Sequence, residues 1–376
     1  MKSVIIVYSQ IYEFGGLEYL FIQLAKFLKK KKLKLIIICF EDKIHFTKYE
    51  NNIKVIKLSN NQNFLKKAKN LKKTIDQINH KGMVMFCDLK SAVYAKLANI
   101  KNYNMNLTDP PSLTEPTVSR LYSKMSWRKK FQYNIKNKIF NKVAKQGIEN
   151  AKNVITNCKA NKKEFKKFYK IKPKIIYQGI QGHFNKRGVS CKPLVFKGEL
   201  NLVSVCRLHK SKNLDWILYG MKYLLEKNHK NKYFKNINLD IIGSGPELKR
   251  LKTISKEINI SKKTKFYGQI SENKKNKLLS NAHINLIPAV QGYGLPALES
   301  LKFGVPIVIN KESRICEILK NNKIVKITKN NKSDFIENLY NYSENLKNNK
   351  ISNYKVNHLP TAETWALALS KLCNWL

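Results

Sequence analysis

Short apolar runs alternate with longer amphipathic segments along most of the chain, and this alternation limits the possible folds more than any other feature of the sequence. Between two such runs, residues 16–28 repeat apolar side chains at helical spacing. Strands that alternate with helices predict an α/β fold, with parallel sheets covered by helices on both faces. The predicted strands span residues 3–9, 34–40, 53–58, 82–88, 102–107, 200–208, 238–245, 264–270, 283–289 and 306–310.

The alternation restarts after a polar stretch, residues 182–200, that has no clear periodicity. We therefore expect two similar α/β halves with a boundary near residues 182–198, in line with the chain length of 376 residues, which favours about two domains. A last helix is predicted over residues 362–375, where Trp365, Leu369 and Leu372 form an apolar stripe.

No apolar run reaches the roughly 18 residues that a membrane span needs. The first apolar run lacks the small-residue pattern of a cleavage site, so we interpret it as a buried strand rather than as a signal peptide. The seven cysteines include no C-x-x-C pair, and several lie inside apolar runs. They are expected to be buried free thiols, which favours a reducing cytosol.

The net charge of +47 comes almost entirely from lysine, because only six of the 72 basic residues are arginine. A coding bias toward lysine and asparagine explains such a composition, and so does a basic surface for an anionic partner. Nucleic acid is the least supported partner, because no nucleic-acid-binding motif accompanies the charge.

The segment "PAVQGYGLPALESLKFGVPIVIN", residues 288–310, follows a predicted strand and carries one acid, Glu299. We expect Glu299 in the first turn of a helix that begins after a glycine-rich turn. Such a turn lets a ligand approach the backbone, and a helix N-terminus attracts anions. A carboxylate at that place either accepts hydrogen bonds from hydroxyls or caps the helix dipole.

A second cluster, "VCRLHKSKNLDWIL", places Arg207 just after a strand and Lys212 at the start of a helix. The carboxyl ends of parallel strands are where α/β proteins bind ligands, and the two cations suit a diphosphate. The aspartates form no D-x-D pair, and no His, Asp and Glu residues have metal-ligand spacing. If a diphosphate leaves here, protein cations must stabilise it in place of a metal.

Three segments, "GYGLPALESLKFGVPIV", "VCRLHKSKNL" and "DIIGSGPELKRL", together resemble the signatures of group 1 (family 4) retaining glycosyltransferases. Weaker similarity is carried by "YEFGGLEYLFIQLAKFL", "IIYQGI" and "AETWALAL". The resemblance implies the GT-B fold, with two Rossmann-like domains facing each other across a cleft and a C-terminal helix that crosses back to the first. It implies an acceptor-binding domain at residues 1–185 with 361–376, and a nucleotide-sugar-binding domain at 195–358.

The resemblance also implies roles for single residues. Glu299 would hold the nucleotide ribose, and Arg207 and Lys212 would neutralise the leaving diphosphate. The remaining donor contacts would come from the backbone at Gly294, Leu295, Pro296, Gly15 and Gly16. No metal and no cofactor are expected, since the nucleotide sugar is itself a substrate. For Gly243 and Gly245 we favour a tight strand-to-helix turn over a role in binding.

Two positions depart from the family pattern. Gln291 stands where the family has the first acid of its paired-glutamate motif, which usually contacts a hydroxyl of the donor sugar. Losing that charge-assisted bond costs on the order of 1–2 kcal/mol, or roughly tenfold in rate. In "MNLTDPPSL", Thr108 and Asp109 stand near the place of a histidine–aspartate pair. Asp109 either faces the reaction centre or caps a proline-rich turn.

Residues 118–148 contain no acid, and from Trp127 to Val143 an apolar residue recurs at every fourth position among lysines. The pattern predicts a basic helix that either lies on an anionic membrane or packs its apolar side on the core.

The resemblance thus implies a metal-independent, retaining hexosyltransferase. From the same resemblance we expect it in the cytoplasm, either free or at the inner face of the membrane, using a glycan or lipid-linked acceptor in polysaccharide or lipopolysaccharide assembly. A degenerate sugar-nucleotide-binding or scaffold protein and a sugar-nucleotide epimerase are the alternatives.

Overall fold

The computed structural model describes residues 2–114, 126–182, 189–191, 198–347, 354–356 and 359–376. The chain divides into two units: Met1–Gln181 with Pro360–Leu376, and Gly182–Leu359. The predicted first domain ends at residue 185 and the predicted second domain begins at residue 195, whereas the units meet at residues 181 and 182. The binding roles given to the two domains remain predictions. Residues 118–125 of the basic stretch and most of the predicted boundary segment lie outside the described residues.

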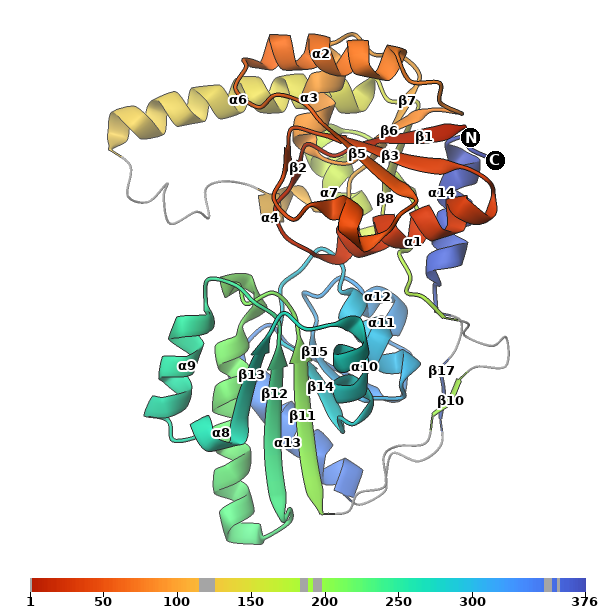
Figure 1. Ribbon diagram of the computed structural model, residues 1–376. Coiled ribbons are helices and arrows are strands. Elements are labelled where there is room, and N and C mark those ends of the chain that lie inside the picture. Colours follow the sequence, from red (N-terminus) through yellow and green to blue (C-terminus); the bar gives the residue numbers. More distant parts are fainter. Residues whose placement is uncertain (1, 115–125, 183–188, 192–197, 348–353, 357–358) are drawn as a thin grey trace. The chain divides into compact units, whose positions relative to one another are not determined.

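The first unit is built on a seven-stranded parallel sheet of strand order β5-β3-β1-β6-β7-β8-β9 (Figure 1). From β1 the chain proceeds outward to β3 and β5, and then returns to place β6 on the other side of β1. The strands are β1 Ser3–Val7, β3 Lys34–Cys39, β5 Ile53–Lys57, β6 Val84–Phe86, β7 Tyr103–Asn106, β8 Asn153–Thr156 and β9 Lys174–Ile175, with the separate short pair β2 Gln10–Ile11 and β4 Glu41–Asp42.

Apolar helix faces cover this sheet. One core cluster joins the sheet to α2, α3, the end of α6 and α7, and α1 packs beside β3 and against α14. The predicted helix at residues 16–28 is confirmed, since α1 spans Gly16–Lys30. The other elements are η1 Phe46–Tyr49, α2 Phe64–Asp76, α3 Leu89–Leu97, α4 Pro111–Thr114, α6 Trp127–Glu149, α7 Lys159–Tyr169 and α14 Ala362–Leu372.

The end of the chain belongs to the first unit, as the resemblance implied. Thr361 caps α14, its hydroxyl accepting from the Thr364 N–H at 3.1 Å. Trp375 is fully buried and donates its indole N–H to the Met83 carbonyl at 2.9 Å. Gly82 has a φ of +70° and leaves no room for a Cβ, which would lie 2.4 Å from the Cys373 carbonyl oxygen.

The second unit repeats the design with a six-stranded parallel sheet of order β13-β12-β11-β14-β15-β16. Helices α8, α9 and α13 pack on one core cluster, and Leu279 of α10 packs on another. The strands are β11 Glu199–Val205, β12 Asn236–Ile242, β13 Thr264–Gly268, β14 Ile284–Ile287, β15 Ile307–Asn310 and β16 Val325–Thr328, with the separate antiparallel pair β10 Val189–Cys191 and β17 Tyr354–Val356. The helices are η3 Lys210–Lys212, α8 Leu214–Asn231, α9 Leu248–Glu257, η4 Ser261–Lys263, α10 Glu272–Ser280, α11 Leu295–Lys302, α12 Cys316–Leu319 and α13 Lys332–Lys347.

Within the described residues, no helix is long and apolar enough to cross a membrane. The cysteines whose surroundings are described are free thiols, and all of them are buried except the half-buried Cys206. Burial raises the pKa of Cys39, Cys316 and Cys373 to about 12. These thiols therefore stay protonated at neutral pH, as expected of packing residues rather than nucleophiles.

Candidate functional site

In the second unit, the strand order of the sheet reverses between β11 and β14. The chain leaves β11 for β12 and β13 on one side, and β14 then pairs with β11 on the other side. Ligands of open α/β sheets bind at such a switch point, beyond the carboxyl ends of the strands. Arg207 and Lys212 follow β11, while Gln291 and Gly294 follow β14. The sheet topology thus places the two predicted clusters at the same switch point.

Hydrogen bonds tie the two segments together. The Lys212 ammonium donates to Gln291 Oε1 at 2.7 Å. Beside it, the Val290 N–H donates to the Ser211 carbonyl at 2.9 Å, and the Asn213 side chain donates to the Pro288 carbonyl at 3.0 Å. Asn213 adopts a left-handed φ of 49°, a conformation that asparagine tolerates better than most residues.

Gln291 is held at both ends of its amide. An ammonium can only donate, so Lys212 fixes which side of the amide carries the oxygen. The Gln291 Nε2 then donates to Ser313 Oγ at 3.1 Å, and Ser313 donates to the Ala289 carbonyl at 2.8 Å. The result is a chain of hydrogen bonds with one direction, from Lys212 through Gln291 and Ser313 to the backbone.

Arg207 is exposed just beyond β11, and Lys212 is half-buried. Burial raises the pKa of the nearby Cys206 thiol to about 11, and the two cations oppose this rise. The turn after β12 packs closely on the segment that carries Cys206 and Arg207, since a Cβ on Gly243 would lie 1.9 Å from the Cys206 carbonyl oxygen. Gly243 and Gly245 have φ values of +135° and +154°. They form the tight turn that we favoured, and this turn supports the backbone that carries Arg207.

Helix α11 begins at Leu295 after Gly294, whose φ is +128°. The prediction that Glu299 lies in the first turn is wrong, because the helix starts at Leu295 and Glu299 is its fifth residue. The turn that precedes the helix also carries no acid that could cap its N-terminus. Glu299 is therefore not explained as a dipole cap.

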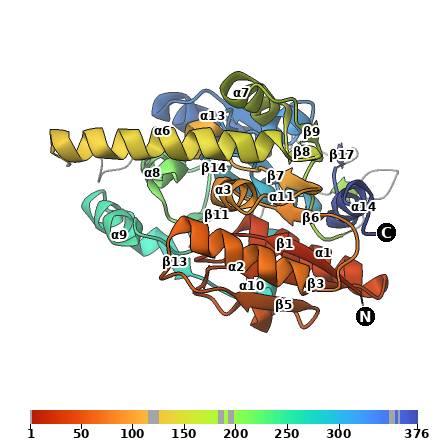
Figure 2. The ribbon, with the colours of Figure 1, turned by 90° about the horizontal axis from the view of Figure 1, so that it is seen from above.

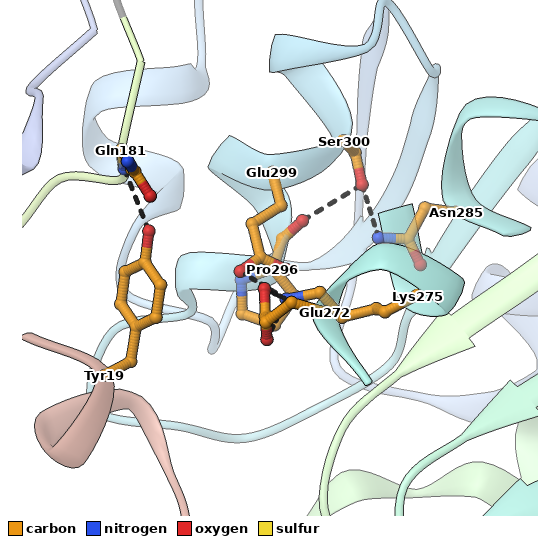
Figure 3. A network of polar contacts seen from close by, with 8 residues as sticks. All are labelled: Tyr19, Gln181, Glu272, Lys275, Asn285, Pro296, Glu299 and Ser300. Atoms are coloured by element: carbon orange, nitrogen blue, oxygen red, sulfur yellow. Dashed lines mark hydrogen bonds and ion pairs between the residues drawn. The ribbon is translucent and has the colours of Figure 1, made fainter. Parts of the chain in front are cut away.

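The partner of Glu299 is Lys275 on α10, whose ammonium lies 2.9 Å from Glu299 Oε1 and 2.9 Å from Glu272 Oε2 (Figure 3). The Glu299 side chain is 14% exposed and that of Lys275 is 11% exposed. Burial raises the pKa of Glu299, and Lys275 opposes this shift. Burial also lowers the pKa of Lys275, but its two carboxylate partners outweigh that effect and leave the pKa raised.

The next residue, Ser300, anchors α11 to the sheet. Its hydroxyl donates to the Pro296 carbonyl at 3.0 Å and accepts from the Asn285 side chain at 2.6 Å (Figure 3). Both Asn285 and Ser300 are fully buried. This link fixes the helix that carries Leu295, Pro296 and Glu299 against β14.

In the first unit, Gly15 is the N-cap of α1 and Gly16 is the first residue of that helix. The Gly15 N–H donates to the carboxylate of the buried Glu18 at 3.0 Å. Part of the positive end of α1 is therefore already matched by a protein carboxylate. Asp88 plays a similar role at α3, where it accepts from the Ser91 N–H at 2.6 Å and from the Ser9 N–H at 2.7 Å.

Asp109 is exposed beyond β7 in the same unit. The buried Asn161 donates to the carbonyl of the preceding Thr108 at 2.8 Å and so fixes this turn. Burial raises the pKa of Tyr8 far above its usual range, and Glu18, Asp88 and Asp109 raise it further. The hydrogen bond from the Ser9 N–H places the Asp88 carboxylate close to Tyr8, just beyond the carboxyl end of β1.

Sequence reasoning missed Lys275 and Ser313. The only local signal for Lys275 is its spacing of three residues from Glu272, which many lysines of this chain share with an acid. Across the described residues, no group of three or more His, Cys, Asp or Glu side chains is arranged to hold a metal ion.

Parts of the chain are similar to known proteins. Residues 190–356, nearly the whole second unit but less than half of the chain, match the family model described as "Glycosyl transferases group 1". An uncharacterized glycosyltransferase of Methanocaldococcus jannaschii is 27% identical over 124 residues. That alignment covers 33% of this chain and only 30% of the relative.

Solved structures match the chain almost end to end. The Anabaena protein HepE in complex with UDP-glucose matches with a TM-score of 0.68 and 16% identity, over 99% of this chain and 95% of that one. A lipopolysaccharide outer core galactosyltransferase matches with a TM-score of 0.66 and 15% identity, over 100% of both chains. These likenesses confirm the predicted GT-B fold, and the family match confirms the predicted resemblance to group 1 glycosyltransferases for the second unit.

Proposed function

We propose that the chain transfers a hexose from a nucleotide-sugar donor to an acceptor hydroxyl, with retention of the anomeric configuration. The single observation that carries the proposal is the hydrogen bond from Lys212 to Gln291. It joins the two predicted clusters at the switch point of the very unit that matches the group 1 family.

The pyrophosphate of the donor would lie beside Arg207 and Lys212. When the bond between the anomeric carbon and the phosphate oxygen breaks, negative charge grows on that oxygen, and two fixed cations stabilise it without having to reorganise. The acceptor oxygen bonds to the anomeric carbon on the side that the phosphate leaves, and its proton passes to the departing phosphate oxygen. No metal and no separate protein base are needed for this step.

Glu299 would bind the ribose hydroxyls of the nucleotide. For this purpose its carboxylate must stay charged although burial raises its pKa. Lys275 favours the charged form, so we assign it a positioning role. Gln291 positions the Lys212 ammonium through its Oε1.

The donor class is proposed to be a uridine-diphosphate sugar, because a solved structure with the same fold holds UDP-glucose. The proposed setting is polysaccharide or lipopolysaccharide assembly in the cytoplasm, on a glycan or lipid-linked acceptor. It is supported by the family resemblance and by the lipopolysaccharide galactosyltransferase of the same fold.

A thermal-shift screen of sugar nucleotides, followed by an assay of nucleoside diphosphate release, tests the proposal. A donor far above its dissociation constant stabilises the chain by about 2–4 kcal/mol. We expect one donor class to shift the melting temperature and to release its diphosphate when an acceptor is added. A shift without release, in wild type and in Gln291→Glu alike, would favour the degenerate binding protein. Conversion of the donor alone to its epimer would favour the epimerase.

A further inference from the structure

The outer side of α6 exposes large apolar side chains to solvent. Trp127 is 73% exposed, Phe131 62%, Ile135 44% and Ile139 60%. We call these four residues the outward row. The alternative that the helix packs its whole apolar side on the core is therefore wrong for residues 127–139. Toward its end α6 packs on the core, where Ala144, Gly147 and Ile148 are buried.

The outward row lies opposite the packed side of the helix. At about 100° per residue, each step of four residues turns by about 40°, so the row covers an arc of about 120°. Ala144, Gly147 and Ile148 lie on the other side of the helix axis and face the core. Arg128, Lys138 and Lys142 fall within the same arc as the outward row, and all three are exposed. Apolar and cationic groups thus share one face.

The start of α6 extends beyond the rest of the first unit (Figures 1 and 2). The far end is fixed, because a Cβ on Gly147 would lie 2.1 Å from the Ala92 carbonyl oxygen, which shows how closely α6 packs on α3 there. The outward row therefore belongs to a helix that is anchored at its far end and presents the row away from the unit.

The positive charge of α6 favours an anionic partner. From Trp127 to Glu149 the helix holds seven Lys and Arg residues and one acid, Glu149, which pairs with Lys145 at 3.7 Å. Two copies of this face would repel each other, so self-association through it is disfavoured. An anionic surface that also accepts apolar side chains would satisfy both components. A nucleic acid could stack its bases on the Trp127 and Phe131 rings, but it offers no comparable partner for a continuous row that also includes Ile135 and Ile139.

We propose that α6 docks the protein on an anionic lipid bilayer. The helix lies in the plane of the interface, with the outward row inserted between lipid headgroups. Arg128, Lys138 and Lys142 then reach the headgroup phosphates, because long basic side chains extend toward the polar layer. The arrangement would hold the first unit at the surface where lipid-linked acceptors reside.

Vesicle flotation tests the proposal with the full chain and without donor or acceptor, so that its outcome is independent of the proposed transfer reaction. The vesicles contain phosphatidylcholine alone or phosphatidylcholine with phosphatidylglycerol. We expect binding to the anionic vesicles that weakens with salt, and little binding to the neutral ones. Phe131→Ser/Ile139→Ser and Lys138→Gln/Lys142→Gln should each lower the partition coefficient about tenfold or more.

Matched control variants distinguish binding through the α6 face from non-specific binding by exposed rings or lysines elsewhere on the chain. Phe168→Ser removes an exposed ring on α7, and Lys320→Gln/Lys323→Gln removes two exposed charges in the second unit. Both should bind as wild type does. Equal binding by the α6 variants and their controls would overturn the proposal, and so would the absence of binding to anionic vesicles. Capture of an acidic protein that masks α6, with no vesicle binding, would assign the face to a protein partner instead.

Discussion

Lys212 and Gln291 lie 79 residues apart in the sequence, yet the Lys212 ammonium is 2.7 Å from the Gln291 Oε1. The amide can accept from Lys212 and donate to Ser313 at the same time. A carboxylate at this position could only accept, so Ser313 would have to turn its hydroxyl away from the Ala289 carbonyl. The groups around residue 291 therefore suit the glutamine of this chain, which both accepts and donates, better than the glutamate of the family pattern.

We predict that Gln291→Glu pairs with Lys212 and reduces the positive charge available to the donor diphosphate. The dissociation constant for the donor should rise about fivefold to tenfold, equivalent to ~1 kcal/mol. Titration calorimetry with the donor found by the thermal-shift screen measures this. Ser313→Ala, which removes the acceptor of the Gln291 amide but adds no charge, should change the affinity less. Tighter donor binding by Gln291→Glu would contradict the prediction.

Arg207→Ala should reduce kcat/KM by about 100-fold to 1000-fold, because a fixed cation at the leaving diphosphate is worth roughly 3–4 kcal/mol in the transition state. Arg207 is exposed, so the melting temperature should hardly change. The control is Arg250→Ala, which removes a half-exposed arginine paired with Glu247 at 2.6 Å on α9. Activity of Arg207→Ala within about threefold of wild type would remove Arg207 from the mechanism.

Lys275→Met should destabilise the second unit by about 2 kcal/mol, because it leaves the Glu299 carboxylate buried without its partner. The double variant Lys275→Met/Glu299→Gln should recover part of the loss, with a coupling energy of about 1–2 kcal/mol in urea unfolding. Strict additivity of the two single changes would mean that the pair makes no net contribution.

The same pair predicts a pH dependence. The pKa of Lys275 in the folded chain is raised above its usual value of 10.5. Its contribution to stability is therefore complete below that value and is lost as the pH rises through the raised pKa. The stability difference between wild type and Lys275→Met should stay constant from neutral pH upward and shrink only in strongly alkaline solution. A difference that already disappears near neutral pH would contradict this assignment.

Gly294→Ala should disturb the donor site more than an alanine at another glycine of positive φ. Its Cβ would lie 2.5 Å from the Gln291 Nε2, at a φ of +128°. Gly268→Ala is the control, since Gly268 has a φ of +66° and no atom within 4 Å of the added Cβ. Both should lose about 1–2 kcal/mol of stability to backbone strain. Only Gly294→Ala should also weaken donor binding, as thermal shift with the donor will measure.

Donor turnover should persist in excess chelator and should not rise when manganese is added. The physical reason is that, in the proposed mechanism, Arg207 and Lys212 supply the charge that a divalent ion supplies in metal-dependent transferases. Activity that disappears with chelator and returns with manganese would overturn the metal-independent mechanism.

The sequence predicted the fold well because the strands of both sheets are mostly apolar runs bounded by polar turns, as in β3 and β11. It did not predict β8 or β16, which mix polar and apolar residues over only four positions. The location of Arg207 and Lys212 could be predicted because strand ends are visible in sequence. The pairing of Glu299 with Lys275 could not, because it depends on how α10 and α11 pack, and lysine is too common in this chain to stand out.

Because residues 360–376 complete the first unit, the chain cannot finish folding in the order in which it is synthesised. The second unit has all of its residues once position 359 has left the ribosome, whereas the sheet of the first unit still lacks α14 and the Trp375 indole. Until then, the side of α1 that packs on α14 and the Met83 carbonyl that accepts from Trp375 stay open to solvent. The second unit therefore does not depend on residues 360–376 to complete its fold, whereas the first unit does, and the second unit is expected to mature first.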